Sequence, residues 1–382
     1  MSRLGLSNRK FLQDLLYKYY SLEPLKEPRL LPKREIAVQP IGSKSYVRHL
    51  SFPSMSMLYK YILSKPPLHL YYSSAIYDNP SSEDMESKGW LGSDLIFDID
   101  SDHYPGCSDV IRICPKCGSL VGEEGNKCPN CGSEELVKIP LFDEKCLEMA
   151  WNDVIKIIDV MERDFGAKQY EVAFSGHRGF HVKFEDDFFK DLGRDERRVI
   201  VDYLTLKNIS LEKILQPTGR GRRKDKVLFY KRNEYGFRAR LRDSVLSALE
   251  YRDLGDVIEA DYNEVEKIAM LWKVEVDPVV TMDISRLSRF IGSINGKAGL
   301  AVCELDPDKG LEPVFDKYTV FRGEAIVVPR VDLPEVRILG RKVKLTKGEK
   351  TKLDATLVFY LAVRDLVDVV DYSGVEVVKP CK

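Results

Sequence analysis

Hydrophobic residues follow a helical spacing at the start of the chain and a strand-like spacing soon afterwards. The helical spacing joins Phe11, Leu12, Leu15, Leu16 and Tyr19, and it is interrupted by Pro24, Pro28 and Pro32. Residues 35–39, 45–52 and 68–76 are short runs bounded by Pro or Gly, which is typical of strands. The pattern predicts an opening helix followed by a sheet.

Later patterns alternate between helix and strand. Residues 147–165 keep a 3.6-residue period up to Gly166, which is well placed to end a helix. Residues 170–184 alternate on both sides of a glycine-rich centre, which predicts two strands joined by a tight turn. Residues 187–270 are mostly helical in pattern, and 353–370 predict a last helix that packs on the core. Periodicity alone predicts the α/β class.

The most informative run is 94–100, Asp-Leu-Ile-Phe-Asp-Ile-Asp, in which two carboxylates interrupt a hydrophobic strand. Side chains two positions apart on a strand share a face, so Asp98 and Asp100 project together, about 7 Å apart along the strand. Hard oxygen donors on a rigid strand suit Mg²⁺ or Mn²⁺ in the company of nucleotide phosphates. The run therefore predicts a divalent-metal site.

Four of the eight cysteines form two knuckles, Cys114-Pro-Lys-Cys117 and Cys128-Pro-Asn-Cys131, each followed by glycine. Such knuckles let four thiolates converge on one tetrahedral ion, which predicts a structural zinc ribbon rather than disulfides or a redox pair. Cys107 or His103 is kept as an alternative ribbon ligand. The cysteines without this spacing are interpreted as packing or incidental thiols: Cys107, Cys146, Cys303 and Cys381.

Chemistry also gathers at the turn of the predicted hairpin, Ser175-Gly-His-Arg-Gly-Phe-His181. Its two glycines permit close backbone approach to a phosphate. The hydroxyl of Ser175, the guanidinium of Arg178 and the imidazole of His181 can all bind phosphate oxygens. A plain hairpin with solvated basic residues explains the turn by itself, so the upstream carboxylate pair gives the motif its weight.

A third cluster lies in residues 274–297, where two aspartates compete as metal ligands. Asp283 precedes a short helical pattern over 284–290 that it would cap, whereas Asp277 ends a strand and has no such local role. We therefore favour Asp277 and keep Asp283 as the alternative. The same stretch offers charge-neutralising and hydrogen-bonding groups for a triphosphate: Arg289, Lys297, Ser293 and Asn295.

A basic stripe mixed with aromatic residues lies within 187–270. It consists of Arg220, Arg222, Arg223, Lys224, Lys226, Lys231, Arg232, Arg238, Arg240 and Arg242, with Tyr230, Tyr235 and Phe237 among them. This mixture suits a nucleic-acid backbone with unstacked bases, so we expect a template contact. A solvated loop explains 220–226 about equally well.

Composition and length set the broad class. The 382 residues allow two or three domains, and the formal net charge of −1 neither indicates nor excludes a nucleic-acid partner. No apolar run approaches the roughly 18 residues of a membrane span. The first residues lack the apolar core of a signal peptide, so we expect a cytoplasmic protein without membrane contact.

Taken together, these motifs resemble the small, catalytic subunit of archaeal and eukaryotic replicative DNA primases. The resemblance covers residues 10–340. It rests on an ordered series, which is more specific than any single motif: Arg34-Glu35, Arg48-His49-Leu-Ser-Phe52, Tyr71-Tyr72-Ser73-Ser74, Gly89-Trp90-Leu-Gly, Asp98-Ile-Asp100, Ser175 to His181, and Asp277 to Lys297.

The resemblance implies roles for individual residues. The catalytic metal ligands would be Asp98, Asp100 and Asp277. The nucleotide-binding residues would be Ser175, Arg178, His181, Arg289, Arg48, Asn295 and Lys297. Two positions depart from the family: Asn295 stands where many relatives have histidine, which makes any contact there neutral, and His177 stands where arginine is frequent.

The implied fold is an α/β catalytic core around a mixed, largely antiparallel sheet, with two insertions. The core would comprise residues 1–106, 137–186 and 271–382, the last of these ending in a C-terminal helix. A zinc-binding module would occupy 107–136, and a mostly helical insertion 187–270.

The implied reaction is template-directed nucleotidyl transfer on single-stranded DNA, in which a 3′-hydroxyl attacks the α-phosphate of an NTP or a dNTP and releases pyrophosphate. The resemblance also implies a heterodimer with a large primase subunit. The alternatives are a repair-type primase-polymerase, a nuclease, and a non-catalytic zinc-ribbon protein that binds nucleic acid. The last of these leaves the three aspartates without a purpose, because bare carboxylates repel a nucleic-acid backbone.

Overall fold

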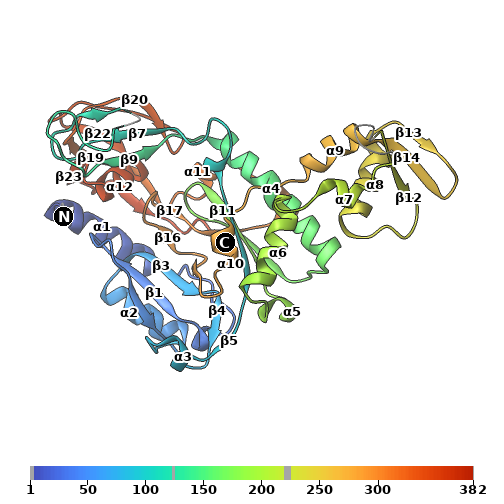
Figure 1. Ribbon diagram of the computed structural model, residues 1–382. Helices are drawn as coiled ribbons and strands as arrows, with labels where there is room; N and C mark the ends of the chain where they lie inside the picture. Colours follow the sequence, from blue (N-terminus) through green and yellow to red (C-terminus); the bar gives the residue numbers. More distant parts are fainter. Residues whose placement is uncertain (1–3, 123–124, 219–224, 382) are drawn as a thin grey trace.

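Two four-stranded sheets form the centre of the molecule (Figure 1). The computed structural model describes residues 4–122, 125–218 and 225–381, and within these ranges every strand pairing is antiparallel. The predicted α/β class is confirmed. The expected sheet was mixed and largely antiparallel: the antiparallel pairing is confirmed, and the described residues contain no parallel pair.

The first sheet has the order β15-β3-β1-β2. Its strands are β1 (Ile36–Pro40), β2 (Val47–Leu50), β3 (Pro67–Ser73) and β15 (Leu287–Arg289), and the N-terminal helical elements are α1 (Leu6–Tyr20), η1 (Leu31–Lys33) and α2 (Met55–Ser64). The predicted opening helix and strands are confirmed, but the third strand is divided at Ser74. Beyond it, β4 (Ala75–Tyr77) pairs with β5 (Trp90–Ser93), and α3 (Met85–Lys88) lies between them in sequence.

The second sheet has the order β18-β10-β11-β6 and contains the predicted metal-binding strand. Its strands are β6 (Leu95–Asp100), β10 (Tyr170–Phe174), β11 (Gly179–Phe184) and β18 (Cys303–Leu305). α4 (Glu144–Phe165) packs on this sheet, where the rings of Trp151 and Phe180 lie 5.3 Å apart. Gly166 ends it in the left-handed conformation, as its sequence predicts, and the Asp143 side chain caps its start.

The cysteine knuckles lie beside the C-terminal strands (Figure 1). The knuckle segment contains η2 (Ser101–His103), β7 (Val110–Ile113), β8 (Leu120–Val121) and β9 (Val137–Pro140). The C-terminal part contains β16 (Ile294–Asn295), β17 (Leu300–Ala301), η3 (Pro307–Lys309), α11 (Val314–Lys317), β19 (Phe321–Pro329), β20 (Leu333–Ile338), β21 (Arg341–Leu345), β22 (Thr351–Asp354), α12 (Ala355–Val363), β23 (Val367–Asp371) and β24 (Val375–Val377). The last helix is shorter than expected, because Asp365 adopts positive φ and the valine-rich residues 367–371 then continue as a strand.

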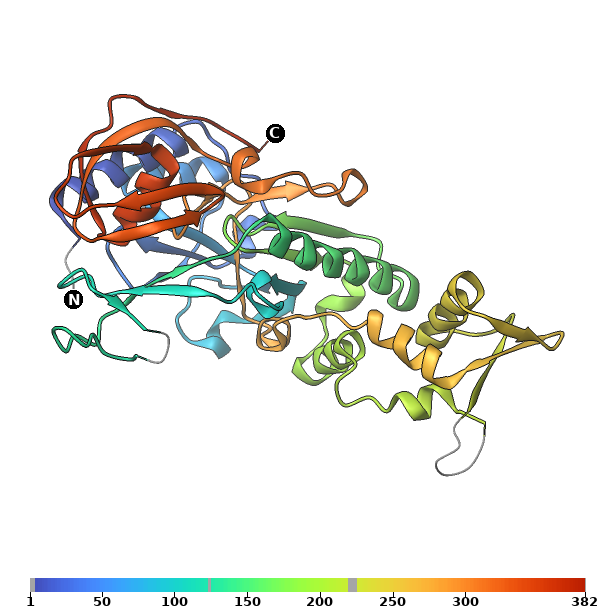
Figure 2. The ribbon, with the colours of Figure 1, turned by 90° about the horizontal axis from the view of Figure 1, so that it is seen from above.

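An arm projects from the central sheet (Figures 1 and 2). Its elements, together with those at its base, are α5 (Asp187–Lys190), α6 (Arg194–Thr205), α7 (Leu211–Leu215), β12 (Lys226–Tyr230), α8 (Gly236–Ala248), β13 (Tyr251–Asp253), β14 (Val257–Asp261), α9 (Tyr262–Leu271) and α10 (Pro278–Met282). The arm has a hydrophobic core of its own that includes Phe229, Leu241 and Val265. Helices dominate it, and a three-stranded sheet in the order β12-β14-β13 accompanies them.

Two disulfides correct the interpretation of the remaining cysteines. Cys107 is bonded to Cys146, and Cys303 to Cys381, so these four residues are paired rather than incidental thiols. The partners are 39 and 78 residues apart in sequence, and only the tertiary fold brings them together.

No helix among the described residues is long and apolar enough to cross a bilayer.

Candidate active site

A cavity of about 490 Å³ opens between the two central sheets and gathers the residues singled out in the sequence. Ten predicted catalytic and nucleotide-binding residues line it: Arg48, Asp98, Asp100, Ser175, Arg178, His181, Asp277, Arg289, Asn295 and Lys297. They come from stretches up to 249 positions apart, Arg48 and Lys297 being the extremes (297 − 48). Convergence of this kind is hard to explain by the needs of folding alone.

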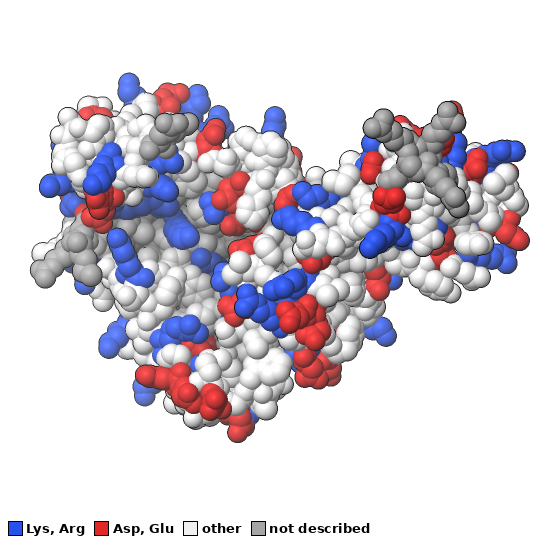
Figure 3. Space-filling model, in the orientation of Figure 1, with Lys and Arg blue, Asp and Glu red and all other residues white. Residues whose placement is uncertain are grey.

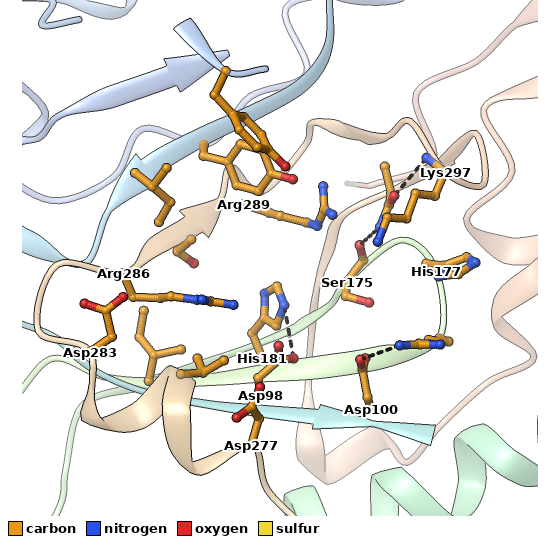
Figure 4. Close-up of a pocket in the computed structure, with 18 of the residues that line it drawn as sticks. Asp98, Asp100, Ser175, His177, His181, Asp277, Asp283, Arg286, Arg289 and Lys297 are labelled. Atoms are coloured by element: carbon orange, nitrogen blue, oxygen red, sulfur yellow. Dashed lines mark hydrogen bonds and ion pairs between the residues drawn. The ribbon is translucent and has the colours of Figure 1, made fainter. Parts of the chain in front are cut away.

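Three carboxylates form one wall of the cavity (Figure 4). Asp98 and Asp100 project from β6, and the backbone N–H of Asp277 donates to the carbonyl of Asp98 over 3.1 Å. Burial, reinforced by the negative charge of Asp100, raises the pKa of Asp98 to about 7. Its Oδ1 is buried without a hydrogen-bond donor among the described residues. Crowded hard oxygen donors with an unsatisfied atom fit a divalent cation.

The structure still favours Asp277 over Asp283 as the third metal ligand, but for a different reason from the one that the sequence offered. Asp277 is itself a helix cap, because it accepts from the Val279 N–H at the start of α10. Residues 284–290 are not the predicted helix but lead into strand β15. Asp283 instead accepts from the N–H and hydroxyl of Ser285. Asp277 remains the better candidate because its charge acts on Asp98, alongside that of Asp100.

The glycine-rich turn between β10 and β11 forms a second wall. At Gly179 a Cβ would lie 2.3 Å from the carbonyl oxygen of Ile99, and at Gly176 it would lie 2.7 Å from the Cβ of Asn295. Only glycine permits these two close approaches. Arg178 reaches back from the turn to the end of β6 and to η2, 3.2 Å from Asp100 and 3.0 Å from Asp102. The turn thus places a guanidinium beside the carboxylates.

His181 follows the turn on β11, directly opposite Asp98 in the pairing of β11 with β6. Burial lowers its pKa to about 4, and the nearby charge of Arg289 adds to the effect. Its Nε2 lies 3.5 Å from Oδ1 of Asp98. Near neutral pH this imidazole is therefore an uncharged hydrogen-bonding group rather than a cation.

Asn295 has a different local role from the one expected. Its Nδ2 donates to the carbonyl of Ser175 over 2.8 Å, and its Oδ1 accepts from the backbone N–H of Lys297 over 3.1 Å. The amide thereby ties the glycine-rich turn to the following loop. On the other side, Arg364 at the end of α12 donates to the carbonyl of Lys297 over 2.7 Å. The last helix therefore supports the cavity as well as the core.

Arg48 reaches the cavity from β2 and is held from behind by a buried acid. Glu35 pairs with Arg48 over 2.8 Å and with the fully buried Lys88 over 2.6 Å. Burial opposes ionisation of Glu35, but hydrogen bonds from Arg48, Lys88 and the backbone of His49 outweigh it and lower the pKa of Glu35. Glu35 is therefore an anion at neutral pH and holds Arg48 by an ion pair.

Several cavity groups were missed in the sequence. Tyr46, Tyr71 and Arg286 line the cavity, and the guanidinium of Arg286 points toward His181 (Figure 4). His69 lies behind Arg289, with its Nδ1 2.8 Å from Nη1 of that residue. A sequence signal did exist for the strand residues, because His69 and Tyr71 are two positions apart and so share a face.

The predicted zinc-ribbon cysteines do come together. The Sγ atoms of Cys114, Cys117, Cys128 and Cys131 all lie within 4.8 Å of one another, an arrangement that could hold a metal ion. Gly118 and Gly132 follow the knuckles with positive φ. The two alternative ligands are not in this group: Cys107 is bonded to Cys146, and His103 belongs to η2.

Most described residues of the basic stripe form ion pairs with carboxylates of the protein itself. Arg240 pairs with Asp159 and Asp164, Arg238 pairs with Glu234, and Lys231 pairs with Asp253. Residues 220 and 222–224 lie outside the described ranges. Figure 3 shows both signs of charge side by side on the arm. In the same view, Lys and Arg gather along the hollow between the C-terminal strands and the first sheet. The expected template contact is therefore wrong for Arg240, which is buried, and it stays a prediction for the other described residues of the stripe.

Comparisons with known proteins agree over nearly the whole chain. Residues 97–307 match the family model described as DNA primase small subunit, and 323–373 match a second model that describes a primase C-terminal domain. The DNA primase small subunit PriS of Staphylothermus marinus is 39% identical over 371 residues, which is 97% of this chain and 97% of that protein. The corresponding protein of Aeropyrum pernix is 34% identical over 364 residues, covering 95% and 93% of the two chains.

Proposed function

Since the chain belongs to the DNA primase small subunit family, we propose that its cavity makes primers by metal-dependent nucleotidyl transfer on single-stranded DNA. The chain is the catalytic subunit of a DNA primase, a nucleotidyltransferase that acts in DNA replication. The observation that supports the mechanism is the facing arrangement of three carboxylates and a cluster of cations in one cavity. A phosphodiesterase would need the carboxylates but not so many phosphate-binding groups.

In this mechanism Asp98, Asp100 and Asp277 hold Mg²⁺ or Mn²⁺. When bound, the cations would lower the pKa of the attacking 3′-hydroxyl and stabilise the departing pyrophosphate. The 3′-hydroxyl loses its proton to solvent as its oxygen bonds to the α-phosphorus. The bond from that phosphorus to the oxygen that bridges the α- and β-phosphates breaks, and pyrophosphate leaves with the electron pair. The carboxylates fix where this exchange takes place, because they are built on a strand and a helix start rather than on loops.

The opposite side of the cavity binds the triphosphate. Arg178, Arg289 and Lys297 supply positive charge, while Ser175 and the neutral His181 supply hydrogen bonds. Arg178 would exchange its contacts with Asp100 and Asp102 for phosphate oxygens as cations and nucleotide arrive. Asn295 contributes by holding Ser175 and Lys297 in register. Arg48, fixed by Glu35, extends the cationic surface on the far side.

We assign supporting roles to the rest of the chain. The four knuckle cysteines would hold a structural zinc ion within the module at 107–136, because four thiolates suit a closed tetrahedral site. The stretches 1–106, 137–186 and 271–382 would form the catalytic core, and 187–270 a largely helical insertion. A large subunit would complete a heterodimer, and NTPs or dNTPs would be the substrates. DNA replication is consistent with a cytoplasmic location.

Incorporation of labelled NTP and dNTP on unprimed single-stranded DNA with Mg²⁺ or Mn²⁺ tests the proposal. Short products are expected from the wild type and none from Asp100→Ala. Asp195→Asn is the matched control, because that carboxylate is 88% exposed on the arm side of the molecule. If neither protein makes product, even with a primer and a large subunit supplied, the polymerase function is wrong and a nuclease or binding function takes its place.

A further inference from the structure

We infer that His69 is a positioning residue for the triphosphate ligand Arg289: it orients the guanidinium as a neutral acceptor and leaves its positive charge for the nucleotide. This inference rests on the proposed role of Arg289. His69 does not line the cavity, so it acts through Arg289 rather than on the substrate.

The backbone places the two residues together. Arg289 on β15 stands opposite Tyr71 on β3, and His69 is two positions away on the same face of β3. The guanidinium carbon of Arg289 lies 4.9 Å from the centre of the Tyr71 ring. The rings of His69 and Tyr71 are stacked at 6.0 Å. A flat guanidinium held against one ring and bonded to the other has little freedom to rotate.

The hydrogen bonds define which form of His69 is present. Nη1 of Arg289 lies 2.8 Å from Nδ1, and the backbone N–H of Gly296 donates to the same nitrogen over 3.3 Å. Because a guanidinium can only donate, Nδ1 must be the unprotonated acceptor and Nε2 carries the proton. His69 is only 4% exposed, and burial together with the charges of Arg289 and Lys297 lowers the pKa of the imidazole well below its usual value.

The neutrality of the partner distinguishes Arg289 from its neighbours. Arg178 is held by Asp100 and Asp102, and Arg48 is held by Glu35. Within the described residues, no carboxylate lies in ion-pair distance of Arg289. A carboxylate partner would fix the guanidinium equally well but would cancel much of its attraction for a triphosphate. A neutral imidazole gives the orientation without that loss. Figure 4 shows the guanidinium pointing into the cavity, toward the side of Ser175 and Lys297.

The test compares KM and kcat for NTP on a primed template, using the full chain. His69→Leu removes the acceptor and is expected to raise KM about tenfold with kcat little changed, since a hydrogen bond to a charged group is lost. His69→Asn keeps a neutral acceptor at the position of Nδ1 and should stay near the wild type. His69→Asp keeps an acceptor but adds charge, and should raise KM. His103→Leu, an exposed histidine outside the cavity, is the matched control.

A double substitution separates positioning from general packing. Once Arg289→Met has raised KM, adding His69→Leu should raise it no further, because the group being oriented is gone. Equal effects of His69→Leu with and without Arg289, or equal behaviour of His69→Asn and His69→Leu, would overturn the inference. If Arg289→Met leaves KM unchanged, the proposed triphosphate role of Arg289 fails and the inference fails with it. Thermal unfolding of each variant shows whether a loss of activity is a loss of fold.

Discussion

In the arm, Arg238, Arg240 and Lys231 each meet a carboxylate, whereas in the cavity Asp98 and Asp100 meet each other. The arm has a hydrophobic core of its own, and its ion pairs satisfy charges that would otherwise be unpaired near that core. In the cavity Asp100 is paired with Arg178, but Asp98 is crowded by Asp100 and buried, which costs stability until a cation arrives. A dense run of arginines in the sequence is therefore weaker evidence for a functional site than residues that are distant in sequence but meet in one cavity.

The largest effect that would sharpen this contrast is expected from Asp98→Asn. Incorporation should fall by about a thousandfold or more, because one metal ligand is lost. The midpoint of thermal unfolding without divalent cation should rise, because the crowding of Asp98 against Asp100 is relieved. Added Mg²⁺ should stabilise the wild type and not the variant. A variant that is inactive and also less stable would mean that Asp98 is a structural residue.

Arg240→Met should destabilise the arm and leave the rate of nucleotide incorporation unchanged. Arg240 is buried between Asp159 and Asp164. Its removal leaves the largely buried Asp164 without its cation, while Asp159 keeps its pair with Arg163, so we expect a loss of about 3 kcal/mol in the free energy of unfolding. Hydrogen exchange should locate the loosening at α8 and the facing part of α4, with kcat unchanged below the unfolding transition. Lys267→Met, at an exposed pair, is the control and should cost less than about 0.5 kcal/mol.

Acid should weaken the cavity side before the arm. His69 and His177 are buried, and their pKa values are lowered well below 6.5 by burial and by surrounding cations: Arg289 and Lys297 for both, and Arg364 and Arg178 for His177. For these two groups the unfolded chain binds more protons, so each costs about 1.4 kcal/mol of stability per pH unit as pH falls below about 6.5. The lowered pKa of His181 acts in the same direction, whereas the raised pKa of Asp98 offsets the share of one histidine below about pH 7. The arm, residues 205–273, contains no histidine.

Urea unfolding at pH 7.5 and pH 5 measures this difference. In His177→Leu the loss of unfolding free energy between the two pH values should be smaller by the contribution of one histidine. Hydrogen-exchange protection factors in the arm should change little over the same interval. Earlier acid loosening in the arm than around the cavity would contradict the assignment.

The smallest effect is expected from Lys231→Ala. Lys231 is already paired with Asp253, so template affinity should change by less than about twofold and stability by less than about 0.5 kcal/mol. Binding of single-stranded DNA at several salt concentrations measures this. If affinity falls and the salt slope decreases by about one, the lysine contacts phosphate and the arm is a template surface after all.

Much of the fold and most of the candidate site could be predicted from local patterns. The i and i+2 spacing of Asp98 and Asp100 was enough to place both on one strand face, and the glycines at 176 and 179 were enough to mark the turn. What failed depended on tertiary contacts. The partner of Cys303 lies 78 residues away, and the ion pairs of Arg240 come from a different helix. His69 comes beside Arg289 only because β15 returns next to β3, which no local pattern discloses.

The arm also has consequences for how this protein could be shortened. The backbone N–H of Val274 donates to the carbonyl of Leu204 over 3.1 Å, so the chain leaves the central body and re-enters it at almost the same point. What lies between has its own core, while α6 at the base is fixed to the body by Arg197, which donates to the carbonyls of Ser93 and Asp94. A short linker from Leu204 to Val274 would thus join two ends that already touch. The molecule is in this sense modular, and the excised segment is a natural unit to transplant, to replace or to omit in a minimal polymerase.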